Sequence, residues 1–174
     1  MADGLRVPTP ELLVALYREH EGSLRAYLRA RLVGDASIIE DLLQDVFLAA
    51  LARGVPEGDA GPWLFAIARN KAFKHVRDRK TGAPLDGEPP SRALSPAGAA
   101  SEAEERAAVR SAVSGLDADL REAVLLRYEA GLDAPRIARL LDVPVTTVES
   151  RLKRARETLV AGLVRARARQ EVAT

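Results

Sequence analysis

The sequence predicts an all-α protein made of two small helical domains that a flexible linker joins. Apolar residues recur every three or four positions through most of the 174 residues, which is the spacing of an amphipathic helix, and strand signals are nearly absent. Residues 81–101 instead carry four prolines and three glycines, a composition that resists helix and cannot form a core. We therefore expect domain 1 at residues 1–80, the linker at 81–101 and domain 2 at 102–174.

Domain 1 should begin with a helical region that packs on the next helix. Thr9 and Pro10 predict its start, because a threonine hydroxyl can cap a helix and proline suits the first turn. Gly22 predicts a break or kink. The apolar residues of this region are Leu12, Leu13, Leu16, Tyr17, Leu24, Tyr27, Leu28 and Leu32.

Residues 35–52 predict a helix with an apolar stripe and an acidic face. The stripe comprises Ile38, Ile39, Leu42, Leu43, Val46, Phe47 and Leu51. The positions between these residues hold Glu40, Asp41, Gln44 and Asp45. Most acidic faces are simply solvated, so composition alone assigns this one no function.

Residues 62–80 predict a helix that is apolar in its first half and basic in its second. Pro62 suits the first turn, and the residues expected to be buried are Trp63, Leu64, Ile67 and Ala68. Between residues 69 and 80 six cations oppose one acid, whereas between residues 35 and 59 six acids oppose one arginine. The net charge of +1 thus hides two segments of opposite sign, which suggests one surface for nucleic acid and another for a basic protein partner.

Asn70 stands in the middle of this helix, where asparagine is mildly unfavourable. That position is a weak sign of a function, and a local hydrogen bond at a helix bend is the alternative. Aromatic residues make up only 4% of the chain, so extensive base stacking is not expected. We assign Trp63, Phe65 and Phe73 to the core instead.

Domain 2 should begin where Ser101 and Glu104 form a capping-box pattern. A helix is expected within residues 116–131, with Asp117 or Asp119 near its cap and Gly131 at its C-terminal stop. It would hold the segment that follows in place.

Residues 133–156 predict a helix-turn-helix. Asp133 is the expected N-cap of the first helix, which has Pro135 in its opening turn and Ile137, Ala138, Leu140 and Leu141 on its apolar face. Asp142 tolerates the left-handed conformation of a sharp turn, and Pro144 prevents the first helix from continuing. Thr146 or Thr147 would cap the second helix, whose apolar face comprises Val148, Leu152, Ala155 and Leu159.

The other face of this second helix carries small hydroxyls followed by cations. Such a face suits a helix whose start meets base edges while its later turns hold phosphates. An ordinary solvated surface helix is the alternative. We prefer the first interpretation because turn, cap and charge coincide in one short segment.

The helix-turn-helix resembles the promoter-reading domain of the extracytoplasmic-function (ECF) sigma factors of bacterial RNA polymerase. The matching residues are Gly131, Leu132, Ile137, Ala138, Leu141, Pro144, Thr147, Val148, Ser150, Arg151, Leu152, Arg154, Ala155 and Arg156. Arg136 and Thr146 depart from the family pattern, which has an acid and a glycine there. The resemblance implies a sigma region 4-like domain 2 whose contacts with the minus-thirty-five element come from Thr146, Thr147, Glu149, Ser150, Arg151, Lys153 and Arg154.

Domain 1 extends the resemblance, which covers residues 11–159 and implies a sigma region 2-like domain. The run EDLLQDVFL at residues 40–48 resembles the segment that docks on the clamp helices of the largest polymerase subunit. The core polymerase-binding residues that this implies are Asp41, Leu42, Gln44, Asp45 and Phe47. The run WLFAIARN at residues 63–70 is similar to the part that recognises the minus-ten element and holds it open. The residues this implies for that element are Asn70, Lys71, Lys74, Arg77, Arg79 and Lys80.

The resemblance also implies the function and the partners. An ECF-type sigma factor binds core RNA polymerase, through the clamp helices and the flap, recognises a two-part promoter and promotes DNA opening. It is controlled by an anti-sigma factor. There are two alternatives. One is a free-standing helix-turn-helix transcription regulator, and the other is an interaction protein that keeps the sigma architecture but no longer opens promoters.

The sequence contains no motif that indicates catalysis. The chain has no cysteine and two histidines on separate segments, and it has no glycine-rich phosphate loop or nucleophile elbow. We expect no enzyme, no cofactor and no metal. Nothing resembles a signal peptide or a membrane span, so a cytoplasmic protein is expected.

Overall fold

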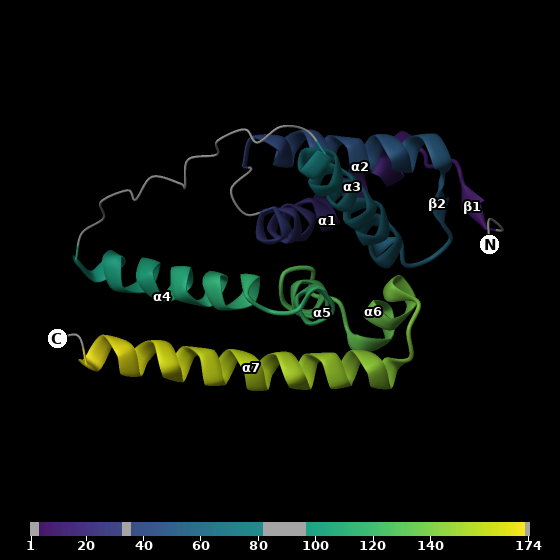
Figure 1. Cartoon of the computed structure of the whole chain (residues 1–174). Coiled ribbons are helices and arrows are strands. Elements are labelled where there is room, and N and C mark those ends of the chain that lie inside the picture. The colour runs from purple at the N-terminus through teal and green to yellow at the C-terminus, as the bar shows by residue number, and fades with distance from the viewer. Residues whose placement is uncertain (1–3, 33–35, 82–96, 173–174) are drawn as a thin grey trace.

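The computed structural model describes residues 4–32, 36–81 and 97–172. Figure 1 shows two layers of helices, with domain 1 above and domain 2 below. The elements of domain 1 are β1 (Leu5–Arg6), α1 (Pro10–Arg31), the 3-10 helix η1 (Ala36–Ile38), α2 (Ile39–Arg53), β2 (Val55–Pro56) and α3 (Gly61–Thr81). Those of domain 2 are α4 (Ala97–Ser114), α5 (Ala118–Tyr128), α6 (Ala134–Leu141) and α7 (Val145–Val172). The described residues are thus almost entirely helical, as the sequence predicts.

Helix α1 begins at its expected cap but has no break. Thr9 has extended backbone angles, and its hydroxyl accepts a hydrogen bond from the Leu12 N–H at 3.3 Å. The helix runs through Gly22, so the break predicted there is wrong. Glycine in a helix costs only about 1 kcal/mol relative to alanine, and burial of Leu24 and Leu28 on the next turns outweighs that.

The core of domain 1 lies between α1, α2 and α3. Its largest fully buried side chains are Leu24, Tyr27, Leu28, Ile39, Leu43, Val46, Val55, Leu64 and Phe65. Some residues expected in the core are not fully buried. Leu51 is 48% exposed and Phe73 is 40% exposed, and Ile38 and Trp63 are only half-buried.

A short antiparallel ribbon, which the sequence does not predict, joins the segment before α1 to the connection between α2 and α3. Leu5 pairs with Pro56 and Arg6 with Val55. Gly54 makes this pairing possible: its φ is +85°, and a Cβ there would lie 2.8 Å from the carbonyl oxygen of Arg6. Only glycine fits so close to the neighbouring strand.

Domain 2 begins earlier than its capping pattern predicts. Helix α4 starts at Ala97, so Ser101 lies inside the helix and does not cap it. Alanines 97, 99 and 100 have high helix propensity, which explains the earlier start. The segment between α3 and α4 is therefore residues 82–96, which lie outside the described residues.

Helix α5 has the expected ends. Asp117 stands at the N-cap, although its side chain accepts no capping hydrogen bond. Gly131 has a φ of +69°, and the Leu132 N–H donates to the Leu126 carbonyl at 3.0 Å, which closes the C-terminal end.

The helix-turn-helix consists of α6 and the start of α7. Asp133 caps α6, because its carboxylate accepts the Arg136 N–H at 2.9 Å. Asp142 has the left-handed angles φ 54° and ψ 51° that the turn was expected to need. The predicted caps at Thr146 and Thr147 are wrong: α7 starts at Val145, and the Pro144 carbonyl accepts the Thr147 N–H at 3.0 Å.

The two domains are in contact rather than merely tethered. Residues of α1 and α3 in domain 1 lie against α5 and α6 in domain 2 (Figure 1). One continuous apolar cluster includes Leu28 and Leu64 from domain 1 together with Leu126 and Ile137 from domain 2.

Candidate nucleic-acid interface

The acidic face of α2 is exposed, but only part of the predicted set lies on it. Asp41, Gln44 and Asp45 are exposed. Leu42 and Phe47 are each only 7% exposed, and the Phe47 ring packs 4.9 Å from the Tyr17 ring. These two side chains therefore belong to the core and are not available to a partner.

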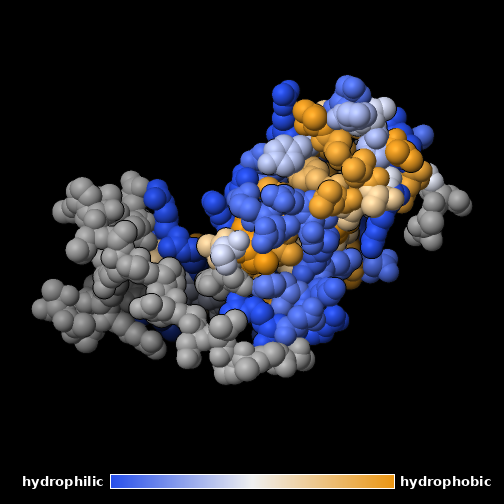
Figure 2. All heavy atoms as spheres, turned by 90° about the horizontal axis from the view of Figure 1, so that it is seen from above, coloured by the Kyte–Doolittle hydropathy of each residue, from blue (hydrophilic) through white to orange (hydrophobic). Residues whose placement is uncertain are grey.

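Leu48 is an exposed apolar side chain that the sequence pattern did not single out. It is 60% exposed and stands three and four positions after Asp45 and Gln44, so it shares their face of α2. Figure 2 shows apolar surface interspersed with polar surface over domain 1, and Val14 and Leu51 are also about half exposed. The spacing from Asp41 was the available signal for Leu48.

Ion pairs surround this acidic face. The Arg25 guanidinium donates to both carboxylate oxygens of Glu40, at 2.8 and 3.0 Å, and this hydrogen bonding lowers the pKa of Glu40. Lys71 Nζ lies 2.9 Å from the Asp45 carboxylate. The structure thus brings together Asp45, which was expected to bind polymerase, and Lys71, which was expected to bind DNA.

The basic half of α3 presents one clear face. Asn70 and Lys74 are exposed, and Arg77 follows at the spacing of the same face with a side chain 72% exposed. Arg77 also lies 3.4 Å from Asp78. Arg79 is exposed, whereas the side chain of Lys80 lies outside the described residues. Lys71 points toward Asp45, and so it lies at the edge of this face.

A buried polar cluster joins the domains beside this face. Glu122 of α5 is 4% exposed, and it accepts a hydrogen bond from the Tyr27 hydroxyl at 2.7 Å. Arg31 Nε and Arg69 Nε lie 3.6 and 3.5 Å from its carboxylate oxygens. Burial, followed by the charge of Glu122, raises the pKa of Tyr27. The sequence did not predict this cluster, because Glu122 occurs in a helix whose spacing marks it only as polar.

Most of the predicted residues at the start of α7 are exposed. Thr146, Glu149, Ser150, Lys153 and Arg154 are all exposed. Thr147 is half-buried. Val148 and Ala155 are completely buried on the opposite face, which confirms the predicted apolar stripe.

Arg151 differs from the other cations of this helix. Its guanidinium donates to the Asp119 carboxylate of α5, and its side chain is 22% exposed. This contact fixes α7 against α5. A DNA contact by Arg151 requires that it share or release Asp119.

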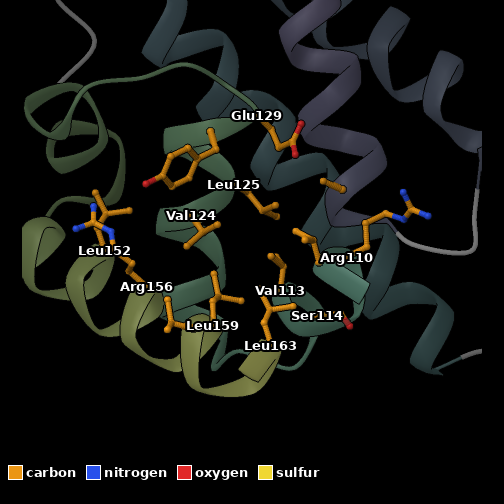
Figure 3. Close-up of a pocket in the computed structure, with 14 residues that line it drawn as sticks. Arg110, Val113, Ser114, Val124, Leu125, Glu129, Leu152, Arg156, Leu159 and Leu163 are labelled. Carbon is orange, nitrogen blue, oxygen red and sulfur yellow. The ribbon is translucent and has the colours of Figure 1, made fainter. Parts of the chain in front are cut away.

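Domain 2 also contains an apolar groove between α4, α5 and α7, with a volume of about 300 Å³ (Figure 3). Val113, Leu125 and Leu159 point into it, and Tyr128 and Val160 at its edge are 64% and 57% exposed. A helix with an apolar face is the kind of partner that such a groove accepts.

The described residues contain no group of three or more side chains suited to hold a metal ion. No helix in the same part of the chain is long and apolar enough to cross a membrane.

A basic helix face on one domain and a helix-turn-helix on the other define a two-part DNA-binding protein. The family described as Sigma-70 region 2 matches residues 16–81, and Sigma-70, region 4 matches residues 106–159. ECF RNA polymerase sigma factor SigC of Mycobacterium tuberculosis is 32% identical over 133 residues, which cover 74% of this chain and 72% of SigC. RNA polymerase sigma-H factor of Pseudomonas aeruginosa is 34% identical over 147 residues, 76% of each chain. The chain therefore belongs to the ECF sigma factors of bacterial RNA polymerase.

Solved structures have the same fold. CnrH, in complex with the cytosolic domain of CnrY, is 27% identical with a TM-score of 0.68, over 91% of this chain and 90% of that one. The sigma factor RpoE of Bartonella quintana, in complex with the anti-sigma factor NepR, has a TM-score of 0.67 at 23% identity, over 89% of this chain and 98% of that one. The likeness to RpoE concerns the fold alone.

Proposed function

We propose that this sigma factor binds core RNA polymerase through α2, directs it to a two-part promoter and promotes opening of the DNA. The observation that carries the proposal is the placement of three distinct surfaces. An acidic and apolar face lies on α2, a basic face with Asn70 lies on α3, and the start of α7 presents hydroxyls and cations.

The polymerase surface on α2 comprises Asp41, Gln44, Asp45 and Leu48. It combines charges with one large exposed apolar side chain, and an interface needs both, because apolar area contributes affinity while charges fix orientation and association rate. Leu48 replaces Leu42 and Phe47 of the predicted set, since those two are buried. The clamp helices of the largest subunit are the proposed partner.

The minus-ten surface on α3 is centred on Asn70, whose amide can both donate to and accept from a base edge. Lys74 and Arg77 lie one and two turns further along the same face, where they would hold backbone phosphates. Lys71, Arg79 and Lys80 extend this basic segment. Separating DNA strands costs about 1.4 kcal/mol per base step, so opening needs several such contacts acting together.

The minus-thirty-five surface is the exposed start of α7. Thr146, Glu149 and Ser150 are placed to meet base edges, and Lys153 and Arg154 to hold phosphates one turn later. Arg151 joins them when it releases or shares Asp119.

We assign the apolar groove of domain 2 to the polymerase flap. The groove opens to solvent and lies on a different part of domain 2 from the minus-thirty-five surface, so both contacts are compatible. An anti-sigma factor is proposed as a further partner, because membership of the ECF sigma factors implies one. We propose the cytoplasm as the location of the chain, since the proposed partners act there, and we expect no enzymatic activity of its own. The free-standing regulator is not favoured by the matches to both sigma regions.

Substitution of Asn70 tests the proposal for α3. Asn70→Ala should reduce transcription from a double-stranded promoter far more than transcription from the same promoter with pre-melted strands, because pre-melted strands do not need to be opened. The Asn70 amide is exposed and has no role in the hydrophobic core, so the fold should remain intact. Ser111→Ala, an exposed change on α4, is the control that should leave both templates unaffected. Equal loss on both templates would refute the role of Asn70 in opening.

A further inference from the structure

Among the residues whose side chains the structure describes, Glu122 is the one charged residue that is buried. It belongs to α5 in domain 2, yet its hydrogen-bond and ion-pair partners Tyr27, Arg31 and Arg69 all belong to domain 1. Helix α5 lies directly below α1 and α3 in Figure 1. The carboxylate thus fills a site that domain 1 provides.

The site on domain 1 is built from two guanidiniums, one phenol hydroxyl and one aromatic ring. Both guanidiniums contact the Phe73 ring, whose centroid lies 4.2 Å from the Arg31 guanidinium carbon and 5.0 Å from that of Arg69. The Arg31 side chain is 10% exposed and that of Arg69 is 31% exposed. A guanidinium suits a phosphate, because its planar fork of N–H donors matches the geometry of two phosphate oxygens.

The fit of Glu122 in this site is incomplete. Arg31 Nε, Arg69 Nε and Glu122 Oε2 are buried without a hydrogen-bond partner, since the ion-pair distances of 3.5 and 3.6 Å are too long for hydrogen bonds. A buried ion pair of poor geometry recovers little of the desolvation of its charges. The arginines are therefore available to an anion that satisfies them better.

The site also borders the proposed minus-ten surface. Arg69 precedes Asn70 directly, and Phe73 stands three positions after Asn70 and one before Lys74. A phosphate bound by Arg69 would thus lie near a base that meets Asn70.

We propose that Glu122 is an internal substitute for a backbone phosphate of promoter DNA, and that Arg31 and Arg69 bind this phosphate when domain 2 moves away. This inference rests on the proposed function of α3. The Arg136–Asp59 ion pair, at 2.8 Å, holds the same two domains together at a second point. The phosphate site formed by Arg31 and Arg69 is thereby closed to DNA until the domains separate.

The first experiment measures binding of the full chain, without polymerase, to a single-stranded DNA of random sequence. If Glu122 keeps nine molecules in ten closed, apparent affinity is reduced about tenfold, so Glu122→Gln should bind about tenfold more tightly than the wild type. Glu129→Gln makes the same change of charge at an exposed position of domain 2 and is the control. Equal gains in the two variants would show a general charge effect and overturn the proposal.

The second experiment tests the phosphate site itself. Arg69→Gln, added to Glu122→Gln, should weaken binding and reduce the slope of log affinity against log salt by about 0.7, the value for one phosphate on a single strand. Arg18→Gln in the same background removes an exposed charge of α1 and should leave the slope nearly unchanged. An unchanged slope with Arg69→Gln would mean that Glu122 covers some other DNA surface. Inorganic phosphate and chloride are also compared as competitors of the DNA at equal ionic strength. Stronger competition by phosphate would mean that the site binds a free anion instead of a DNA phosphate, which would overturn the proposal.

The third experiment measures domain separation. The chain has no cysteine, so Ala52→Cys on α2 and Gly162→Cys on α7 allow a fluorescent pair at two exposed positions. Energy transfer should fall in Glu122→Gln, and less so in Tyr27→Phe, which removes one hydrogen bond but keeps the packing. Unchanged transfer in both variants, with helix content retained, would contradict the closed state. Because no promoter or polymerase is used, these outcomes are independent of whether the proposed function holds.

Discussion

Replacing Asp45 by arginine should remove polymerase binding while the fold remains intact. Asp45 is exposed on α2, and its one described ion pair, with Lys71, is partly exposed on both sides, at 53% and 28%. Such a pair contributes at most about 1 kcal/mol to the free energy of unfolding. A new Arg–Lys repulsion at about 4 Å in water adds about 1 kcal/mol. The loss of stability should therefore stay near 2 kcal/mol or below.

The loss of binding should be larger. Reversing a charge that pairs across a desolvated interface weakens binding by about 2–5 kcal/mol, which is at least about 30-fold in the dissociation constant. The assay is titration of labelled chain with core RNA polymerase, beside thermal unfolding of the same samples. Glu57→Arg, the same charge change at an exposed position outside the α2 face, is the control. Wild-type affinity of Asp45→Arg for core polymerase would refute the assignment of this face.

Three further predictions concern the fold and the second DNA surface. Asp133→Ala removes the carboxylate that accepts the Arg136 N–H and should lower the free energy of unfolding by about 1 kcal/mol in urea titration; no change would mean that the cap contributes nothing. Arg154→Ala should abolish activity on promoters that depend on the minus-thirty-five element and spare those that do not, and an unchanged footprint there would contradict its role. The hydrogen bond from Arg25 lowers the pKa of Glu40 below 4.5. The stabilisation of the fold by this ion pair is therefore present above pH 4.5 and is lost as the pH falls through the lowered pKa of Glu40. Unfolding of Glu40→Gln should therefore differ from the wild type at neutral pH and converge with it in acid; a constant difference would exclude this ion pair as the cause.

Local chemistry made the helix-turn-helix predictable from the sequence. Asp133, Asp142 and Gly131 each take the cap or left-handed conformation expected of them, because these conformations depend on the residue and its immediate neighbours. The caps predicted at Thr146 and Thr147 are wrong because α7 starts at Val145, which places both threonines inside its first turn.

Features that join distant segments were not predictable in this way. The β1–β2 ribbon consists of four residues, too few for an alternating pattern. The contact of Glu122 with Tyr27 joins residues 95 positions apart. The residues around Glu122 do not indicate a contact with Tyr27, and those around Tyr27 do not indicate one with Glu122. The contact between the two domains was therefore not predicted.

Candidate site residues were predictable in kind but not in exposure. Helical spacing assigned Leu42 and Phe47 to the apolar stripe, whereas the family resemblance placed both in the polymerase-binding set. The structure buries both and exposes Leu48. In the same way, Arg151 has the charge expected of a phosphate contact but is held by Asp119.

Co-elution of the purified chain with bacterial core RNA polymerase, followed by sequencing of the transcripts made from fragmented genomic DNA, tests the central claim most directly. We predict a stable complex and new transcripts that share two upstream motifs. Failure to associate with core polymerase, together with tight and salt-sensitive binding to duplex DNA, would contradict the account and favour a free-standing regulator.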